Sequence, residues 1–166
     1  MKERCSQTIF AIVLIGCVAF GSGCGITGNQ YYHDGRRASA SSISPPPSWR
    51  LSGRVPNVTL AVDNDRSTAS VSSLVRSDTE ITIDLQKACV FNTVHVHHGS
   101  MEDGYCARVA VLTSLDGVNF TLQQEVPGTK VVTTLMIIRP ILARYVKVKA
   151  LRQGPGAWSV AEIYLQ

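Results

Sequence analysis

Short stretches in which every second residue is apolar recur along much of the chain. They cover residues 81–85, 94–97 and 145–149, and β-branched runs cover 109–112, 131–138 and 163–165. Because successive side chains of a strand point to opposite faces, this period of two predicts half-buried β-strands. No stretch repeats apolar residues at helical spacing over three turns. The pattern therefore predicts an all-β protein, as a sandwich or a barrel.

Residues that favour turns separate these stretches. Asp116 and Gly117 lie between two alternating runs and predict a hairpin turn of type I′, which requires positive φ. If the strand ending near His98 paired directly with the next one, Cys89 and Cys106 would lie too far apart for a disulfide, which needs Cα atoms within ~7 Å. Two buried thiols are therefore favoured over a Cys89–Cys106 bridge.

The amino terminus resembles an export signal. Two basic residues precede an apolar run from Ile9 to Phe20, which is shorter than the ~20 residues of a membrane span. Cys17 follows Leu-Ile-Gly, like a bacterial lipobox, and Cys24 follows Gly-Ser-Gly. We interpret residues 1–23 as a lipoprotein-type signal peptide, with cleavage before Cys17 or Cys24 and lipidation of that cysteine. The alternative is a simple signal peptide with incidental cysteines.

A change of composition divides the rest of the chain. Residues 25–49 are rich in Gly, Ser, Ala and Pro, which favours an extended, flexible tether over a packed core. Residues 50–166 carry the alternating stretches and are long enough to bury a core. Lipidation would attach this domain to a membrane, and we expect it at the bacterial cell envelope.

Composition and charge narrow the function. Lys and Arg total 16 against 12 Asp and Glu, no run of five like charges occurs, and no zinc-type CxxC pair is present. This balance is too mild for a nucleic-acid partner and excludes a zinc finger. No G-x-S-x-G, phosphate-binding or dinucleotide motif occurs either, so we do not expect an enzyme.

Four motifs in a fixed order indicate a family. They are AVDNDRST at 61–68, ITIDL at 81–85, SLDGVNF at 114–120, and ARYVKV at 143–148 followed by WSVAEI at 158–163. Together they resemble the discoidin, or coagulation factor 5/8 type C, family over about residues 50–166. The resemblance implies an eight-stranded jelly-roll β-sandwich, the galactose-binding-like fold, whose members mostly bind and do not catalyse.

The chain departs from the family pattern at several positions. Gln86 and Asn64 stand where the family prefers glycine, and Ala69-Ser70 stand where it often has Arg-Trp. Asn is one of the few residues that tolerate the left-handed conformation. Arg144 and Tyr145, at the start of a strand, are expected to brace the sandwich.

The first motif contains oxygen ligands for a hard cation. By resemblance, Asp63, Asp65 and Thr68 would join Glu162 of the last strand around a structural calcium ion, which prefers carboxylate, hydroxyl and carbonyl oxygens. The alternative is an Asp-rich turn with solvated carboxylates.

The loop at 97–105 is the richest candidate for a ligand. Its residues His97, His98, Glu102 and Tyr105 could offer a carbohydrate a ring to stack on and polar groups for its hydroxyls. The alternatives are a polar loop without a ligand, and zinc held by His95 and His97 with Glu102 or Asp103.

The leading hypothesis is therefore a lipid-anchored, non-catalytic module that binds carbohydrate at the bacterial envelope. A structural or protein-interaction module of the cell envelope is the alternative. A flat apolar surface patch would favour a protein partner.

Overall fold

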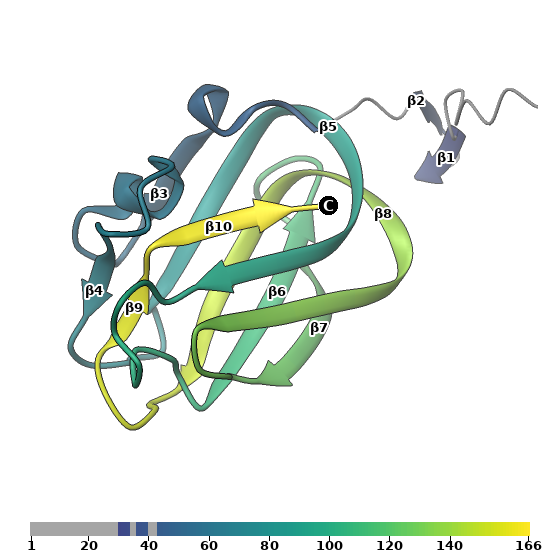
Figure 1. Cartoon of the computed structure of the whole chain (residues 1–166). Coiled ribbons are helices and arrows are strands. Elements are labelled where there is room, and N and C mark those ends of the chain that lie inside the picture. Colours follow the sequence, from purple (N-terminus) through teal and green to yellow (C-terminus); the bar gives the residue numbers. More distant parts are fainter. Residues whose placement is uncertain (1–29, 34–35, 40–42) are drawn as a thin grey trace, which may run out of the picture.

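The computed structural model describes residues 30–33, 36–39 and 43–166 (Figure 1). The predicted signal peptide with Cys17 and Cys24 lies outside these residues, as does much of the predicted tether. The two short strands β1 (Gln30–His33) and β2 (Arg36–Ser39) pair with each other in an antiparallel sheet of their own.

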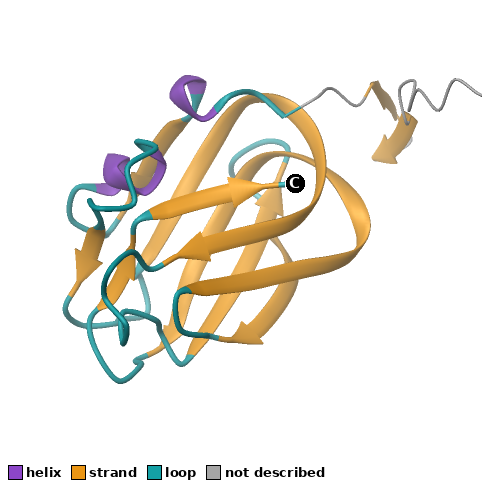
Figure 2. Cartoon of the chain, viewed as in Figure 1, coloured by secondary structure: helices purple, strands orange, loops and turns teal. Residues whose placement is uncertain are grey.

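Residues 43–166 are almost entirely strands and loops (Figure 2). Two short 3₁₀ helices, η1 (Pro46–Ser48) and η2 (Val58–Val62), occur near their start. The strands are β3 (Arg50–Gly53), β4 (Ser70–Ser72), β5 (Glu80–His97), β6 (Arg108–Ser114), β7 (Thr121–Pro127), β8 (Val132–Arg152), β9 (Trp158–Val160) and β10 (Glu162–Leu165). The predicted all-β class is confirmed.

Two long strands, β5 and β8, each take part in both layers of the sandwich. The first half of β5 pairs with β3 and with the second half of β8, which continues to β6 and β7. The second half of β5 pairs with β10 and with the first half of β8. A single hydrogen-bonded sheet thus folds over into a five-stranded and a three-stranded layer, while β4 and β9 form a separate pair.

Each long strand turns from one layer to the other at a bulge. Residues 85–88 of β5 lie opposite the single residue Arg144, and residues 137–140 of β8 lie opposite the single residue Asn92. We call these two bulges the bend end. Because both strands fold back there, their first and last residues meet at the opposite, loop end, where Glu80 pairs with Lys149 and His97 with Val132.

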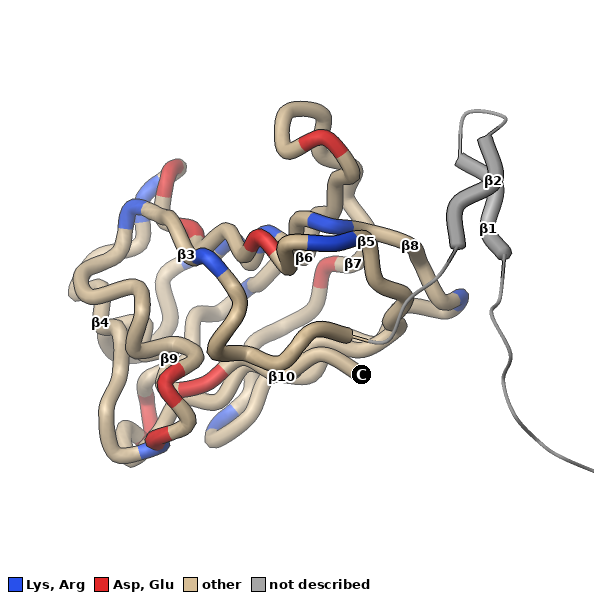
Figure 3. Tube along the Cα trace, turned by 90° about the horizontal axis from the view of Figure 1, so that it is seen from above, with Lys and Arg blue, Asp and Glu red and all other residues tan. Residues whose placement is uncertain are grey.

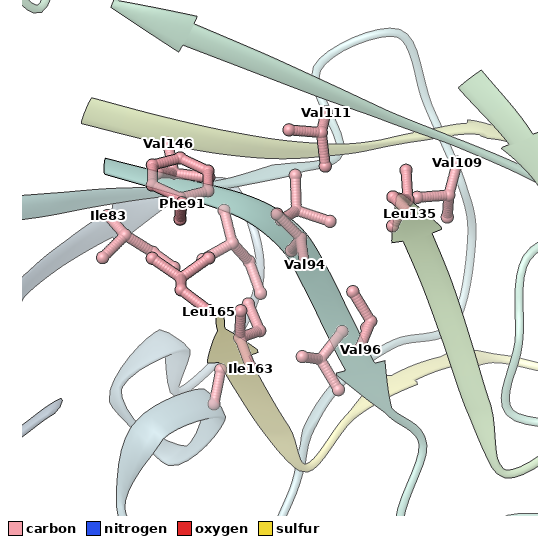
Figure 4. Packing of buried hydrophobic residues seen from close by; sticks show 14 of the residues in the cluster. Ile83, Phe91, Val94, Val96, Val109, Val111, Leu135, Val146, Ile163 and Leu165 are labelled. Atoms are coloured by element: carbon pink, nitrogen blue, oxygen red, sulfur yellow. The ribbon is translucent and has the colours of Figure 1, made fainter. Parts of the chain in front are cut away.

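The core lies between the two layers and follows the predicted alternation. Ile81, Ile83 and Leu85 are fully buried and point inward, whereas Thr82 and Asp84 between them are only partly buried. Figure 4 shows Ile83 and Val146 packing with residues of the opposing layer, among them Phe91, Val94, Ile163 and Leu165. This apolar contact is what holds the layers together.

The end of the predicted tether packs on the domain. The buried Ser44 hydroxyl donates a hydrogen bond to the Leu85 carbonyl oxygen at 2.6 Å, and the Trp49 indole donates to the Ser44 carbonyl oxygen at 2.8 Å. Trp49 is itself part of the hydrophobic core. The packed chain thus begins before residue 50 and meets the domain at the bend end.

Two details of the predicted strand pairing are wrong. β5 does not pair with β6, because β8 lies between them. The cysteines nevertheless agree with the favoured interpretation, since Cys89 and Cys106 are both buried and no disulfide joins them. The 114–121 connection is longer than a two-residue type I′ turn. Gly117 has positive φ (77°), but the Asp116 carboxylate accepts hydrogen bonds from the backbone N–H groups of Val118 and Asn119 and so organises a wider loop.

The expected brace is present. Arg144 donates two 2.9 Å hydrogen bonds to the Asp84 carboxylate, and its guanidinium lies 5.0 Å from the centre of the Tyr145 ring. The bidentate pair holds the pKa of Asp84 below its usual value. The brace crosses from β5 to β8 directly beside the first bulge.

Candidate functional site

Several loops gather at the loop end of the sandwich. They are the segments 63–69, 73–79, 98–107, 128–131 and 153–157. A Cβ atom on Gly128 would overlap the Cys106 carbonyl oxygen, and one on Gly154 would overlap the Tyr105 carbonyl oxygen. Only glycine allows such close approach of two backbones. Three of the loops therefore pack backbone against backbone around Tyr105, which gives its side chain a rigid support.

His98 is not available to a ligand, contrary to the sequence prediction. Its side chain is fully buried, and its Nδ1 lies 2.7 Å from the Ser159 carbonyl oxygen while its Nε2 lies 2.9 Å from the Thr133 hydroxyl. Because a carbonyl oxygen can only accept, Nδ1 carries the proton and Nε2 accepts from Thr133. Burial also lowers the pKa of His98. The neutral ring joins β8 to β9 as a structural element.

His97 lies on the outer face of the three-stranded layer. Its ring and the Tyr164 ring form a T-shaped pair with their centroids 5.3 Å apart, and the Arg66 guanidinium lies 5.6 Å from the centre of the Tyr164 ring. Burial, and then the charge of Arg66, lowers the pKa of His97. His97 is therefore placed with Tyr164 and Arg66, on a different face from the buried His98.

Glu102 and Tyr105 are accessible at the loop end. Glu102 is exposed and accepts a 2.7 Å hydrogen bond from the Lys130 ammonium, which also lies 3.8 Å from Asp103. The hydrogen bond from Lys130, and then its charge, lowers the pKa of Glu102. Tyr105 is partly exposed, with its ring centre 6.4 Å from that of His98. An aromatic ring, two carboxylates and an ammonium group are thus available near each other.

Lys130 was not predicted from the sequence, and neither was the backbone that positions it. The next residue, Val131, has a φ of 67°, and the Val132 N–H donates to the Lys130 carbonyl oxygen at 2.7 Å. This is a tight γ-turn, which is strained and rare for a β-branched residue. Strain of this kind gathers at functional sites. The only sequence signal was an isolated lysine after a Pro-Gly turn.

The 73–79 loop is attached to the same end through Gln153. The Gln153 amide oxygen accepts a 2.7 Å hydrogen bond from the Val75 N–H, and its amide nitrogen donates to the Gly156 carbonyl oxygen at 2.5 Å. Leu74 in this loop is 56% exposed. The loop end therefore combines polar groups with an exposed apolar side chain.

The predicted calcium residues lie together beside the start of β10. The Asp63 carboxylate accepts hydrogen bonds from the Asp65 N–H at 2.9 Å and from the Thr68 hydroxyl at 2.7 Å. Both bonds lower the pKa of Asp63. Asn64 between the two aspartates has a φ of 64°, as expected for a residue that tolerates the left-handed conformation. Figure 3 shows acidic positions next to β9 and β10.

Glu162 differs from the aspartates in being buried. Its side chain is 1% exposed, and its Oε1 atom has no hydrogen-bond partner among the described residues. Burial raises the pKa of Glu162, and the neighbouring Asp63 adds to this. A buried carboxylate oxygen without a partner is unfavourable unless a cation or a proton compensates for it.

The described residues contain no group of three His, Cys, Asp or Glu side chains arranged to hold a metal. This removes support from the zinc alternative, since His95 bonds to Thr134 at 3.0 Å and Glu102 pairs with Lys130. A calcium ion has other requirements, because hydroxyl and backbone carbonyl oxygens supply much of its coordination.

No helix within the described part of the chain has the length and apolar character of a membrane span. The family model described as F5/8 type C domain matches residues 38–163. No match was found among curated proteins.

Solved structures share the fold. CpGH89CBM32-5 from Clostridium perfringens, in complex with GalNAc-β-1,3-galactose, superposes with a TM-score of 0.64 at 22% identity, covering 75% of this chain and 99% of that chain. The family 32 CBM of NanJ from C. perfringens, in complex with galactose, gives 0.63 at 18% identity, covering 75% and 97%. Chitosan-binding module 1 of a chitosanase/glucanase from Paenibacillus sp. IK-5 gives 0.60 at 19% identity, covering 76% and 98%. These likenesses confirm the jelly-roll fold.

Proposed function

Because the chain belongs to the F5/8 type C domain family, we propose that it is a non-catalytic module that binds carbohydrate through its loop end. The observation that carries the proposal is the partly exposed Tyr105 ring beside the Lys130–Glu102 ion pair, on loops that pack backbone to backbone. Structural neighbours that are carbohydrate-binding modules support it.

The proposed chemistry follows from these groups. A sugar ring would stack on Tyr105, while Glu102 and Lys130 would bond to its hydroxyls. The ion pair is solvent-exposed, with side-chain exposures of 76% and 53%, so opening it for a ligand costs little. Binding by such an open surface is expected to be weak, about 4 kcal/mol at a millimolar dissociation constant.

A glycan array and polysaccharide-retardation gels, run with the purified chain in millimolar calcium, test the proposal. We expect specific binding that Tyr105→Ala abolishes. The matched control is Tyr164→Ala, because Tyr164 is also partly exposed but contacts His97 and Arg66 on another face. If Tyr105→Ala still bound sugar and Tyr164→Ala did not, the binding site would lie at Tyr164 and His97 instead. No binding across a broad panel, by a folded chain, would contradict the proposal.

A structural calcium ion forms a second part of the proposal. Asp63, Asp65, Thr68 and Glu162 would hold it, and the buried Glu162 Oε1 atom without a partner supports this assignment. When bound, the ion would supply positive charge where Asp63 and Glu162 now repel each other. The residues themselves would fasten the 63–69 loop to the start of β10.

The third part is a lipid anchor at Cys17 or Cys24, which would place the protein at the bacterial cell envelope. The basic start, the short apolar run and the lipobox-like residues support it. Mass spectrometry of the amino-terminal peptide, in Cys17→Ala and Cys24→Ala chains, would identify the modified residue. An unmodified peptide in the parent chain would contradict the anchor.

A further inference from the structure

The first half of β8 is an edge strand of the three-stranded layer. Figure 1 shows β10, the second half of β5 and the first half of β8 side by side in this order, as their pairing requires. β6 pairs only with the second half of β8, and no described strand pairs with the far side of residues 132–136. Such an edge presents backbone groups to any strand that can pair with it.

The register shows which backbone groups point outward from this edge. The His98 N–H donates to the Val131 carbonyl oxygen at 2.9 Å, so these two residues continue the β5–β8 ladder as a hydrogen-bonded pair. Bonded and non-bonded pairs alternate in an antiparallel ladder, and residues 133 and 135 therefore also bond to β5. The N–H and C=O groups of Thr134 and Met136 point the other way, where no described strand pairs with them.

This edge lacks the protection that edge strands usually have. Residues 132–138 include no charged residue and no proline, and Met136 and Ile138 are 65% and 94% exposed. By contrast, β7, at the edge of the other layer, contains Glu125 and ends at Pro127. An uncharged edge segment of high β-propensity associates with other strands unless something covers it. The first half of β8 is therefore the edge at which a further strand would add.

A shallow groove lies between β7 and the bend of β8. Ile138 and Ile141 line it from β8, Gln123 and Gln124 line it from β7, and its volume is about 420 Å³. A strand added beside residues 132–138 would cover the side of this groove and would need an apolar side chain to fill it. Val131, which is 60% exposed at the start of β8, is a side chain of that kind.

The charges at the two ends of this segment are complementary. Arg139 at the bend end is exposed and forms no ion pair with a carboxylate of the described residues. At the loop end, the single ammonium group of Lys130 lies near both Glu102 and Asp103. Antiparallel pairing of two copies brings the bend end of each beside the loop end of the other. Each Arg139 would then meet an excess of negative charge.

We propose that a second copy of this chain covers the edge, with residues 132–138 of the two copies paired antiparallel. Thr134 of each copy lies opposite Met136 of the other, so that about four backbone hydrogen bonds form around a two-fold axis at Leu135. In this register Arg139 lies opposite Val131 of the other copy, beside its Glu102 and Asp103, and Val131 enters the groove. The proposal goes beyond the proposed function and relies neither on sugar binding nor on the lipid anchor.

Sedimentation velocity and amide hydrogen exchange test the proposal on the full chain, purified in detergent. We expect a dimer that forms as the protein concentration rises. Exchange within residues 132–138 should slow by at least roughly tenfold in the dimer, because the outward N–H groups of Thr134 and Met136 become hydrogen-bonded. A chain that remains monomeric at about 1 mM, or a dimer in which this segment gains no protection, would overturn the proposal.

A charge on the edge tests which strand pairs. Met136→Lys should weaken dimerisation at least roughly tenfold, because the two introduced lysines would lie close together across the axis. Leu122→Lys is the matched control, since Leu122 is also apolar and 54% exposed but lies on β7. Both side chains are exposed, so equal unfolding temperatures should show that both variants are folded. Dimers of Met136→Lys as stable as those of the parent chain would overturn the proposal.

A charge exchange tests the antiparallel register. Arg139→Glu and Asp103→Lys should each weaken the dimer, because each places like charges at the contact between the copies. The two substitutions combined in one chain should restore dimerisation, since the exchanged charges again attract across the axis. Dimerisation that is unchanged by Arg139→Glu, or that the combined variant does not recover, would overturn the proposed pairing.

Discussion

The two ends of the sandwich are built from the same two strands and yet differ in character. At the loop end, β5 and β8 begin and finish, and their loops pack closely and expose paired charges such as Lys130 and Glu102. At the bend end, the same strands pass without interruption through bulges that expose Ile138 and Arg139. The comparison shows that strand alternation determines the core, whereas local backbone geometry determines what each end offers to a partner.

The largest expected effect comes from His98, which supports the loop end from inside. His98→Ala would leave the Ser159 carbonyl and the Thr133 hydroxyl without their partner and would open a cavity, at a cost of about 3 kcal/mol in the free energy of unfolding. Chemical denaturation measures this loss. A loss below about 1 kcal/mol would show that the loop end does not depend on this ring.

His98 also gives stability a pH dependence. Its pKa is lowered in the folded state, so its contribution is present above the ordinary pKa of about 6.5 and is lost as the pH falls through the folded-state pKa. We expect the parent chain to lose stability between pH 7 and pH 5, and His98→Gln to lose less of it. Identical pH profiles would contradict this assignment.

The next largest effect on stability is expected from the buried carboxylate of Glu162. Its folded pKa is raised, so the stability associated with the protonated form is lost as the pH rises above the ordinary value and through the folded-state pKa. In chelator at neutral pH, Glu162→Gln should therefore stabilise the chain by about 1 kcal/mol.

In calcium, the parent chain should instead be more stable than Glu162→Gln. A bound ion stabilises the parent chain by about 2.7 kcal/mol at a concentration of 100 times its dissociation constant, and Glu162→Gln should lose most of this gain. Differential scanning calorimetry with calcium and with chelator gives the comparison. Unfolding temperatures of the parent chain that do not respond to calcium would contradict the calcium site.

The third prediction compares strained backbone at the two ends. Val131 at the loop end and Gln86 at the bend end both have positive φ, 67° and 66°. Val131→Asn should stabilise the chain by about 1 kcal/mol and Gln86→Gly by about 0.5 kcal/mol, because asparagine and glycine accept this conformation more easily. If strain at Val131 serves binding, only the first variant should weaken polysaccharide retardation. Equal effects on binding would remove the distinction between the ends.

The smallest effect on stability is expected for Lys130→Ala. Its ion pair with Glu102 is exposed, so its removal should change the free energy of unfolding by less than about 0.5 kcal/mol. Sugar retardation should nevertheless weaken. A stability loss as large as that of His98→Ala would show that Lys130 is structural.

Sequence alternation predicted the fold and part of the site. The same alternation that places His95 and His97 on the outer face places Val94, Val96 and His98 inward, so the burial of His98 was implied by its position in the run. The four ordered motifs also predicted the family. These signals are local, and they suffice because each strand buries one face.

The rest of the site depends on contacts between distant segments. Lys130 reaches Glu102 only because a γ-turn at Val131 redirects the chain, and the conformation of Val131 is set by loops that pack from other parts of the sequence. Similarly, the three consecutive exposed residues Ile138, Arg139 and Pro140 lie in a bulge opposite Asn92, and strict alternation does not predict such a run. Lys130 and these bulge residues were therefore not identified from the sequence.

The pairing of β3 with β5 has a mechanical consequence. The amino-terminal segment enters at the bend end, and β3 then runs toward the loop end with four residues in register, from Arg50 opposite Asp84 to Gly53 opposite Ile81. A pulling force between an anchored amino terminus and a polymer held at the loops would act along these strands. Their hydrogen bonds would be loaded together in shear rather than opened one at a time, which would help the proposed binding module to stay folded under tension.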